Sequence, residues 1–161
     1  MYKPINSLLF LLVAFAGCTG RIEDRLIQEA NQACSGTTKS ECPVALNIVT
    51  PFEWERVYFF DSWTPADSIQ RVIGFGYLGD GVEDDYTRMV FTKGTAVVHE
   101  EDFHKFDYQS ATISISEIAD SLSQAKIPFL TPNNALLLAQ KDKVKEAGCA
   151  ECFYYSFSVK N

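Results

Sequence analysis

The chain has 161 residues, of which 47% are hydrophobic and 13% aromatic, so it holds enough apolar material for the core of one ordinary domain. Its 21 acidic and 14 basic side chains give a formal net charge of −7. This excess of acid argues against nucleic-acid binding, which depends on clustered Lys and Arg, and against contact with an anionic membrane through a basic face.

The N-terminus has the pattern of an export signal. Lys3 precedes an apolar run from Leu8 to Ala16, which is shorter than the roughly 20 residues that a spanning helix needs but suits a secretory signal peptide. The run ends on small residues, Ala16 and Gly17, directly before Cys18. This pattern resembles the lipobox of bacterial lipoproteins, in which small residues precede an obligatory Cys, although Phe15 stands where Leu is usual.

The resemblance implies that residues 1–17 are removed and that Cys18 becomes a lipid-modified N-terminus. Removal of 17 residues from 161 leaves 144, with 13 basic and 21 acidic side chains and a net charge of −8. Thr19 follows the cysteine where Asp would favour retention, which resembles sorting to the outer membrane of a two-membrane host. The alternative is an ordinary secreted protein with an odd cysteine near its start.

The other cysteines form an even set, which in an oxidising compartment predicts two disulfides. They are Cys34, Cys42, Cys149 and Cys152. We favour the local pairing of Cys34 with Cys42 and of Cys149 with Cys152, while pairing between the two ends of the chain would close longer loops and stabilise more in the chain-entropy model. The last two also form a Cys-x-x-Cys pair, so a periplasmic thiol–disulfide protein is the alternative function. However, a thioredoxin-type pair opens a helix, whereas this one precedes a predicted strand.

We expect one globular domain over residues 21–161, after a very short tether of residues 18–20. Apolar residues at helical spacing predict a first helix over 21–33: Ile22, Leu26, Ala30 and Ala33. A short β-rich run over 57–60 predicts a core strand. A helix then starts at Pro65, capped by Thr64, and ends at Gly74. Its buried side is expected to contain Ile69, Val72 and Ile73.

Three aromatic residues flank this strand and helix start: Phe52, Trp54 and Trp63. The block over 51–74 is similar to a signature of small uncharacterised exported bacterial proteins: Phe-x-Trp-acid, an aromatic strand, aromatic-Thr-Pro and a short helix ending in Gly. Glu55 stands here where Asp is usual. The resemblance implies no activity. We expect the three aromatic side chains to clamp the corner between strand and helix, since aromatics in a small domain are mostly core. The alternative is a ligand or partner site at Trp54 and Trp63.

The remaining elements follow from turn and periodicity signals. Strands over 86–92 and 95–100 flank Lys93-Gly94, a two-residue hairpin turn, and a short strand follows over 103–108. A capping box at 114–117 opens a helix that Pro128 ends. The region 132–147 fits a helix or a strand, and its Thr-Pro start and Lys-rich end favour the helix. Alternating side chains predict a last strand over 152–159.

Motifs for catalysis or metal binding are absent from the sequence. The acidic residues Asp80 and 83–85 lack the spacing of an EF-hand loop, which favours a solvated turn over a calcium site. His99 and His104 lack the spacing of a zinc protease, although a weak metal site with Glu100, Asp102 or Asp107 is an alternative. No P-loop, dinucleotide fingerprint or Gly-x-Ser-x-Gly elbow occurs. We therefore assign no catalytic residue, cofactor or metal.

These patterns predict an α+β fold with one antiparallel sheet of four or five strands, three or four helices and disulfide staples. The expected function is that of a non-catalytic envelope lipoprotein. Its lipid holds it to the membrane, and it binds another envelope protein in a structural or inhibitor-like role. Trp54 and Trp63 are the candidate residues for contact with a ligand or partner. No nucleic-acid partner is expected.

Overall fold

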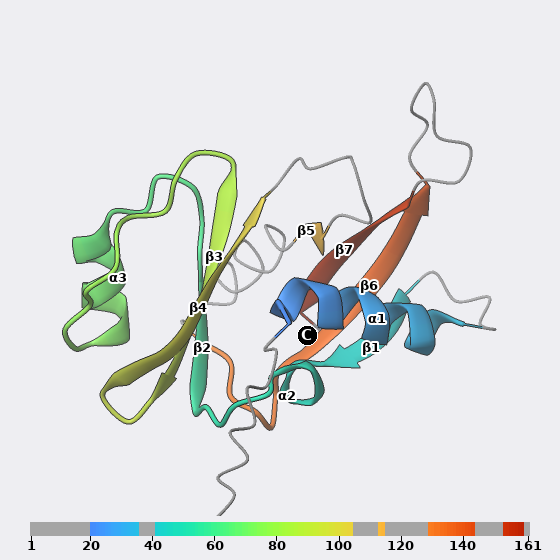
Figure 1. Cartoon of the computed structure of the whole chain (residues 1–161), viewed down its shortest axis with the longest axis horizontal. Coiled ribbons are helices and arrows are strands. Elements are labelled where there is room, and N and C mark those ends of the chain that lie inside the picture. Colours follow the sequence, from blue (N-terminus) through green and yellow to red (C-terminus); the bar gives the residue numbers. More distant parts are fainter. Residues whose placement is uncertain (1–19, 36–40, 105–112, 115–128, 144–152, 160–161) are drawn as a thin grey trace, which may run out of the picture.

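The computed structural model describes residues 20–35, 41–104, 113–114, 129–143 and 153–159 (Figure 1). No helix in these ranges is long and apolar enough to cross a membrane. The predicted α+β class is confirmed. The elements in chain order are α1 (Ile22–Cys34), β1 (Glu41–Ala45), α2 (Leu46–Val49), β2 (Arg56–Phe60), α3 (Ala66–Ile73), β3 (Tyr86–Lys93), β4 (Ala96–His104), β5 (Ile113–Ser114), β6 (Leu136–Lys143) and β7 (Phe153–Val159).

The strands form two sheets, whereas the sequence predicted one. A four-stranded sheet has the order β1-β6-β7-β5, in which only β5 and β7 are parallel, and an antiparallel three-stranded sheet has the order β2-β3-β4. β1 pairs with β6, so that Val44 lies opposite Leu137. Such a pairing between distant segments has no local signal, which is why the division into two sheets was not predicted.

The main core joins α1 to both sheets (Figure 1). Helix α1 begins and ends close to the predicted residues and buries the side of the helix that was expected to be apolar. The four-stranded sheet contributes Val44, Leu137, Ala139, Tyr155 and Phe157, and the three-stranded sheet contributes Val57, Met89, Phe91 and Phe103. The Tyr155 hydroxyl donates to Asn31 Oδ1 at 2.7 Å, which fixes α1 to β7. Leu130 exchanges two backbone hydrogen bonds of 2.9 Å with Val57, which links the two sheets.

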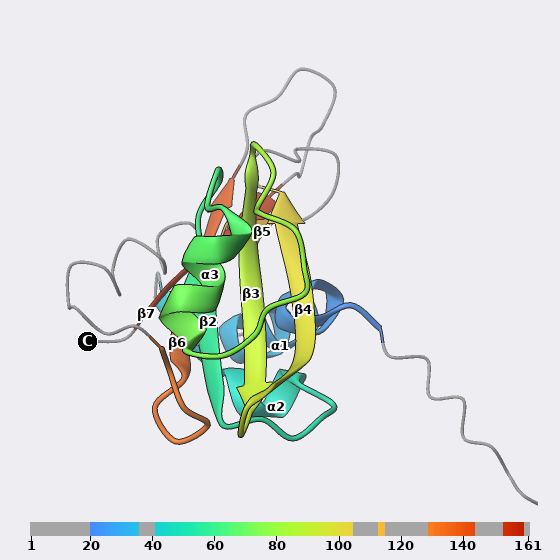
Figure 2. The same ribbon diagram turned by 90° about the vertical axis from the view of Figure 1, so that its left-hand side faces the viewer.

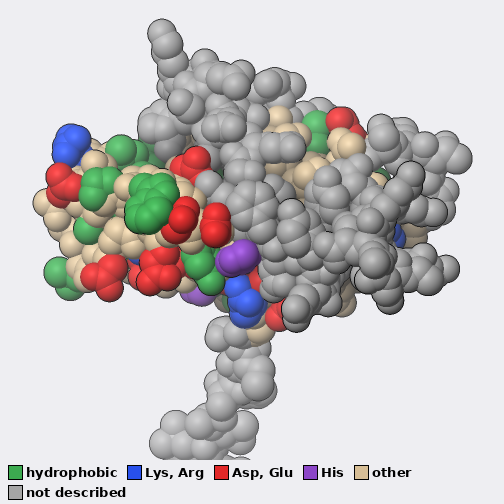
Figure 3. Space-filling model, turned by 90° about the horizontal axis from the view of Figure 1, so that it is seen from above, with side chains coloured by type: hydrophobic (Ala, Val, Ile, Leu, Met, Phe, Trp, Pro, Cys, Tyr) green, Lys and Arg blue, Asp and Glu red, His purple; other side chains and the backbone are tan. Residues whose placement is uncertain are grey.

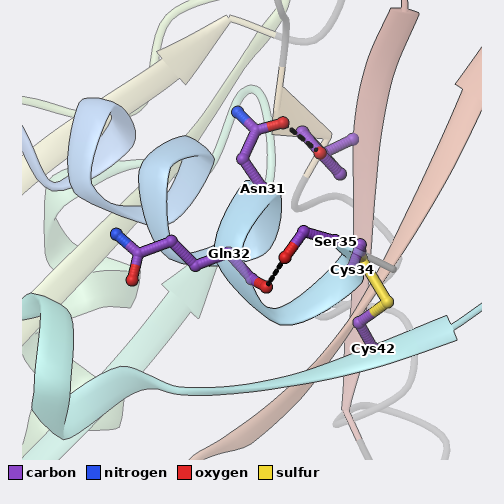
Figure 4. Close-up of a disulfide and its surroundings, with 6 residues drawn as sticks. Asn31, Gln32, Cys34, Ser35 and Cys42 are labelled. Atoms are coloured by element: carbon purple, nitrogen blue, oxygen red, sulfur yellow. Dashed lines mark hydrogen bonds between the residues drawn. A yellow bond between two sulfur atoms is a disulfide. The ribbon is translucent and has the colours of Figure 1, made fainter. Parts of the chain in front are cut away.

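A disulfide joins the end of α1 to β1. Cys34 and Cys42 are bonded, with their Cα atoms 5.4 Å apart (Figure 4). The local pairing favoured from the sequence is therefore confirmed for these two residues, while Cys149 and Cys152 lie outside the described residues.

A second apolar cluster lies on the other face of the three-stranded sheet, where α3 packs against β2 and β3 (Figure 2). It contains Tyr58, Phe60, Ile69, Ile73, Tyr77, Val82 and Val90. Helix α3 ends at Gly74 (φ 86°), as predicted. However, it starts one residue late, because the Thr64 hydroxyl donates to the Asp61 carbonyl at 2.6 Å and does not cap the helix. Val72, which was expected to be buried, is exposed.

The helix favoured over 132–147 is wrong, since residues 136–143 form β6. Alternate residues Ala135, Leu137 and Ala139 are buried, and β1 and β7 pair with the strand on either side. The Thr-Pro signal belongs instead to a turn, in which Asn134 Oδ1 accepts from the backbone and hydroxyl of Thr131.

The predicted hairpin and last strand are confirmed as β3–β4 and β7. The hairpin turn is one residue later than expected, at 94–95, because Lys93 pairs with Ala96. Gly94 supplies the left-handed backbone of that turn (φ 58°). The helix predicted after Ser114, and the part of the 103–108 strand that follows His104, lie outside the described residues.

Candidate functional site

An exposed tryptophan, Trp63, lies in the turn between β2 and α3. Its side chain is 72% exposed, and its φ of 65° lies in the left-handed region that bulky residues rarely adopt. A residue held in such a conformation costs roughly 1–3 kcal/mol. The structure around the turn must therefore fix it.

Three hydrogen bonds hold this turn against the segment 82–86. The backbone N–H of Trp63 donates to the Val82 carbonyl at 3.1 Å, and the N–H of Val82 donates to the Thr64 carbonyl at 2.9 Å. The Ser62 hydroxyl donates to the Tyr86 carbonyl at 3.0 Å. The turn is thus attached to both ends of that segment.

Gly81 lets the two segments approach closely. A Cβ atom at this position would lie 3.0 Å from the Thr64 carbonyl oxygen and 3.3 Å from Pro65 Cα. A side chain there would push the Trp63 turn away from its hydrogen-bonding partner.

Acidic side chains lie on the turn of Trp63 and on the segment bonded to it. Glu83, Asp84 and Asp85 are exposed and lie between the two points at which segment 82–86 is bonded to the turn, and exposed Asp61 belongs to the turn itself. In Figure 3, acidic side chains lie beside hydrophobic ones at the α3 end of the molecule. We call Asp61, Trp63 and residues 83–85 the Trp63 surface. The acidic loop predicted as a solvated turn therefore forms one surface with this tryptophan.

A network around Arg88 lies beside this surface. The Arg88 side chain is only 9% exposed, and its Nε and Nη2 donate to the two carboxylate oxygens of Asp102, both at 2.6 Å. Its Nη1 donates to the Tyr77 hydroxyl at 2.9 Å and to the Asp80 carbonyl at 2.7 Å. The Tyr77 hydroxyl donates to Glu100 Oε2 at 2.8 Å. The network therefore ties the chain that follows α3 to β3 and β4.

The electrostatics of this network suit a structural role. Hydrogen bonding to Asp102 raises the pKa of Arg88 above its ordinary value. Burial, together with the hydrogen bond to Glu100, raises the pKa of Tyr77 to about 12. A group that moves protons near neutrality needs a pKa near the working pH. These two groups instead keep their protons and hold residues 77–80 in place.

The two tryptophans that the sequence suggested as one site lie apart. Trp54 is 7% exposed in the main core, donates from Nε1 to Thr50 Oγ1 at 2.8 Å and meets Phe91 edge-on at 5.4 Å. Phe52 also packs against Phe91, at 5.2 Å. The expected clamp of Phe52, Trp54 and Trp63 is therefore wrong, because the five residues of β2, about 16 Å of strand, separate the first two from Trp63.

Three open depressions lie on the described surface, one of them, of about 480 Å³, at the C-terminal half of α3. One of about 550 Å³ is lined by residues 76–79 and 95–100, including the exposed side chains of Leu78 and Val98. Another of about 320 Å³ lies beside Trp54 and the ion pair of Glu53 with Lys93. Trp63 lines none of the three, so they give no support to a small-ligand site between the two tryptophans.

The two histidines lie on opposite faces of β4, as their odd separation requires. His99 packs on Phe52 at 4.8 Å, whereas His104 meets the ring of Tyr86 at 5.0 Å. Among the residues that the structure describes, no group of three or more His, Cys, Asp or Glu is placed to hold a metal ion. Asp107, one of the ligands considered, falls outside them.

Sequence reasoning missed the role of Glu101. Its carboxylate, 9% exposed, accepts hydrogen bonds from the backbone N–H groups of Ile22 at 2.9 Å and Glu23 at 3.2 Å. Helix α1 has no capping side chain of its own. Glu101 therefore caps α1 from β4, at the first residues after the predicted tether, and its distance along the chain leaves no local signal.

Three of the predicted site cysteines, Cys18, Cys149 and Cys152, lie outside the described residues. Lipidation and the Cys-x-x-Cys disulfide therefore stay predictions. Comparison with known protein families, curated proteins and solved structures finds no match. The Trp63 surface is thus the candidate site that the geometry itself supports.

Proposed function

We propose that the protein is a lipid-anchored, non-catalytic envelope protein that binds another protein through the Trp63 surface. Cys18 carries the lipid, Thr19 after it directs the protein to the outer membrane, and the short tether keeps the domain near the bilayer. A second disulfide, between Cys149 and Cys152, belongs to the same proposal. The role is structural or inhibitor-like.

The observation that carries the proposal is a largely exposed tryptophan on a strained backbone. Trp is enriched among the residues that dominate protein–protein binding energies. Glycine would occupy the same backbone position without strain. Retaining Trp63 thus sacrifices stability for an exposed side chain, a trade that is typical of binding and catalytic sites.

The position of the turn also supports the proposal. In Figure 2 the first described residues, in dark blue, lie beside α1, whereas the arches that carry residues 61–65 and 80–86 lie at the top. A lipid attached two residues before Gly20 therefore leaves the Trp63 surface clear of the anchor point.

Replacement by glycine tests the proposal. We expect Trp63→Gly to keep or raise the free energy of unfolding, by about 1 kcal/mol, because the left-handed strain is removed. The same variant should lose its partner. The matched control is Leu78→Ala, which removes another exposed apolar side chain without a strained backbone.

The partner is detected by placing a photo-crosslinking amino acid at position 63 of the full chain in cells of the native host. Position 48, an exposed isoleucine on α2, is the control site. We expect one stoichiometric protein adduct from position 63 and none from position 48. The proposal fails if position 63 gives no protein adduct, or if Trp63→Gly costs several kcal/mol as a core residue would.

A further inference from the structure

We infer that the partner presents a basic segment, with a Lys or Arg side chain against the ring of Trp63 and between the surrounding carboxylates. This inference rests on the proposed function and names the chemistry of its partner. It follows from the charge and the rigidity of the Trp63 surface.

The arrangement matches a cation in two ways. The Trp ring is the aromatic face that attracts cations best, with gains from about 0.5 to about 2 kcal/mol as the contact is desolvated. Four exposed carboxylates belong to its turn and to the segment bonded to that turn, those of Asp61 and of Glu83, Asp84 and Asp85. Arg is favoured over Lys, since its guanidinium plane stacks on an aromatic face and binds a carboxylate with two hydrogen bonds.

Arg88, on the strand that begins at the end of segment 82–86, is already engaged. Arg88 gives its donors to Asp102, Tyr77 and the Asp80 carbonyl, so its charge is directed into the sheet. It therefore does not supply the cation that the Trp63 surface fits.

Other occupants match this surface less well. A second copy would bring two sets of these four carboxylates together, and an anionic membrane would be repelled for the same reason. A divalent cation is not favoured either, since no group of three potential ligands is assembled among the described residues.

The Trp63 surface is also preorganised by hydrogen bonds. Residues 62–64 are bonded to 82 and 86, and Gly81 permits their close contact. Little conformational entropy is then lost when a partner docks, which favours affinity without a large buried area.

The first test measures the local electrostatic potential at Trp63 in the detergent-solubilised full chain. Buried Trp54 is the internal reference, and Trp63→Phe identifies the signal of Trp63. We expect cesium ions to quench Trp63 fluorescence several-fold more strongly than iodide, when each is expressed relative to its quenching of free tryptophan. The difference should vanish when Glu83→Gln, Asp84→Asn and Asp85→Asn are combined.

The second test uses a defined probe: a labelled peptide of alternating Arg and Gly, with a citrulline version that keeps the shape and removes the charge. We expect the Arg peptide to bind at least about tenfold more tightly than the citrulline peptide, and to weaken from about 50 mM to about 500 mM NaCl. The triple neutral variant and Trp63→Gly should each lose most of this preference. A remote variant with the same change in charge, Asp24→Asn, Glu29→Gln and Glu41→Gln, should change it less than about twofold.

The outcomes separate this inference from the proposed function. Equal binding of the two peptides, or an unchanged preference in the triple neutral variant, overturns the inference. A crosslinked partner at position 63 then leaves the proposed function standing. A dimer of the chain that Trp63→Gly abolishes makes a second copy the occupant and also overturns the inference.

Discussion

The three-stranded sheet presents two faces that are buried in different ways. The face toward α1 contributes Val57, Met89, Phe91 and Phe103 to the main core, each 1% exposed or less. The face toward α3 places Arg88 and Asp102 beside Tyr58 and Val90. The first face buries mostly apolar side chains, with the carboxylate of Glu101 only on its edge strand at the start of α1, whereas the second face includes a charged pair and a network of directed hydrogen bonds.

This difference between the two faces separates the stability of the domain from the placement of the Trp63 turn. Apolar burial is non-directional and scales with area, so it stabilises the domain without fixing any one loop. The hydrogen bonds of Arg88 are directional and reach Tyr77 and Asp80, in the chain that leads to Gly81 and Val82. We therefore expect the first face to determine global stability and the second to determine the placement of the Trp63 turn.

The largest expected effect is that of Phe91→Ala. Phe91 is fully buried and its ring meets those of Phe52 and Trp54, so its loss should lower the free energy of unfolding by about 3–5 kcal/mol. Denaturant unfolding measures it. The exposed Val72→Ala serves as control and should change stability by less than about 0.5 kcal/mol. A cost below about 1 kcal/mol for Phe91→Ala would remove the distinction between the faces.

A smaller effect is expected for Arg88→Met, which removes the charge on the α3 face. It leaves the partly exposed Asp102 without its bidentate partner, at a cost of about 2–3 kcal/mol. Hydrogen exchange should show earlier opening at the Val82 amide, which is bonded to the Thr64 carbonyl. The control is Arg71→Met, whose exposed pair with Asp67 should contribute less than about 0.5 kcal/mol. Uniform loss of protection across the domain would mean that the network does not act on the loop in particular.

Local sequence signals predicted much of this fold. Apolar spacing placed α1, Gly74 ended α3, and alternation placed β7, because each signal lies within the element that it specifies. The Thr-Pro pair at 131–132 gave a wrong prediction of a helix, since the same residues also suit a turn. The residues that follow form the strand β6 because β1 and β7 pair with them on either side.

The candidate site was predicted only in part. Trp63 and the acidic residues 83–85 were each visible in the sequence, but nothing local shows that hydrogen bonds to Val82 and Tyr86 bring them together. The left-handed backbone of Trp63 has no sequence signal either, since bulky residues rarely adopt it.

The adjacent residues Glu100 and Glu101 provide a third test of the comparison between the two faces, because they lie on opposite faces of β4. Glu101→Ala removes the acceptor of the Ile22 and Glu23 amides and should cost about 1 kcal/mol, with faster exchange at those amides. Glu100→Ala should leave them unchanged and perturb Tyr77 instead. Equal effects of both variants on the start of α1 would argue against a specific cap.

The last effect appears only at alkaline pH. The pKa of Tyr77 is raised from 10.0 to about 12, so the folded state holds the phenolic proton more tightly than the unfolded state does. The resulting stabilisation is complete below pH 10.0 and is lost as the pH rises through about 12. Tyr77→Phe should therefore flatten the dependence of unfolding free energy on pH in this range.

Glu100→Gln provides the graded control for Tyr77. It keeps a hydrogen-bond acceptor but removes the charge that, with burial, opposes formation of the phenolate, so the pKa of Tyr77 should fall part of the way toward 10.0. Phenolate absorbance, followed against pH in wild type and Tyr77→Phe, isolates this one group. An unchanged titration in Glu100→Gln would assign the shift to burial alone. Tyr77 would then be held on the α3 face by Arg88, and the carboxylate of Glu100 would not contribute to its pKa.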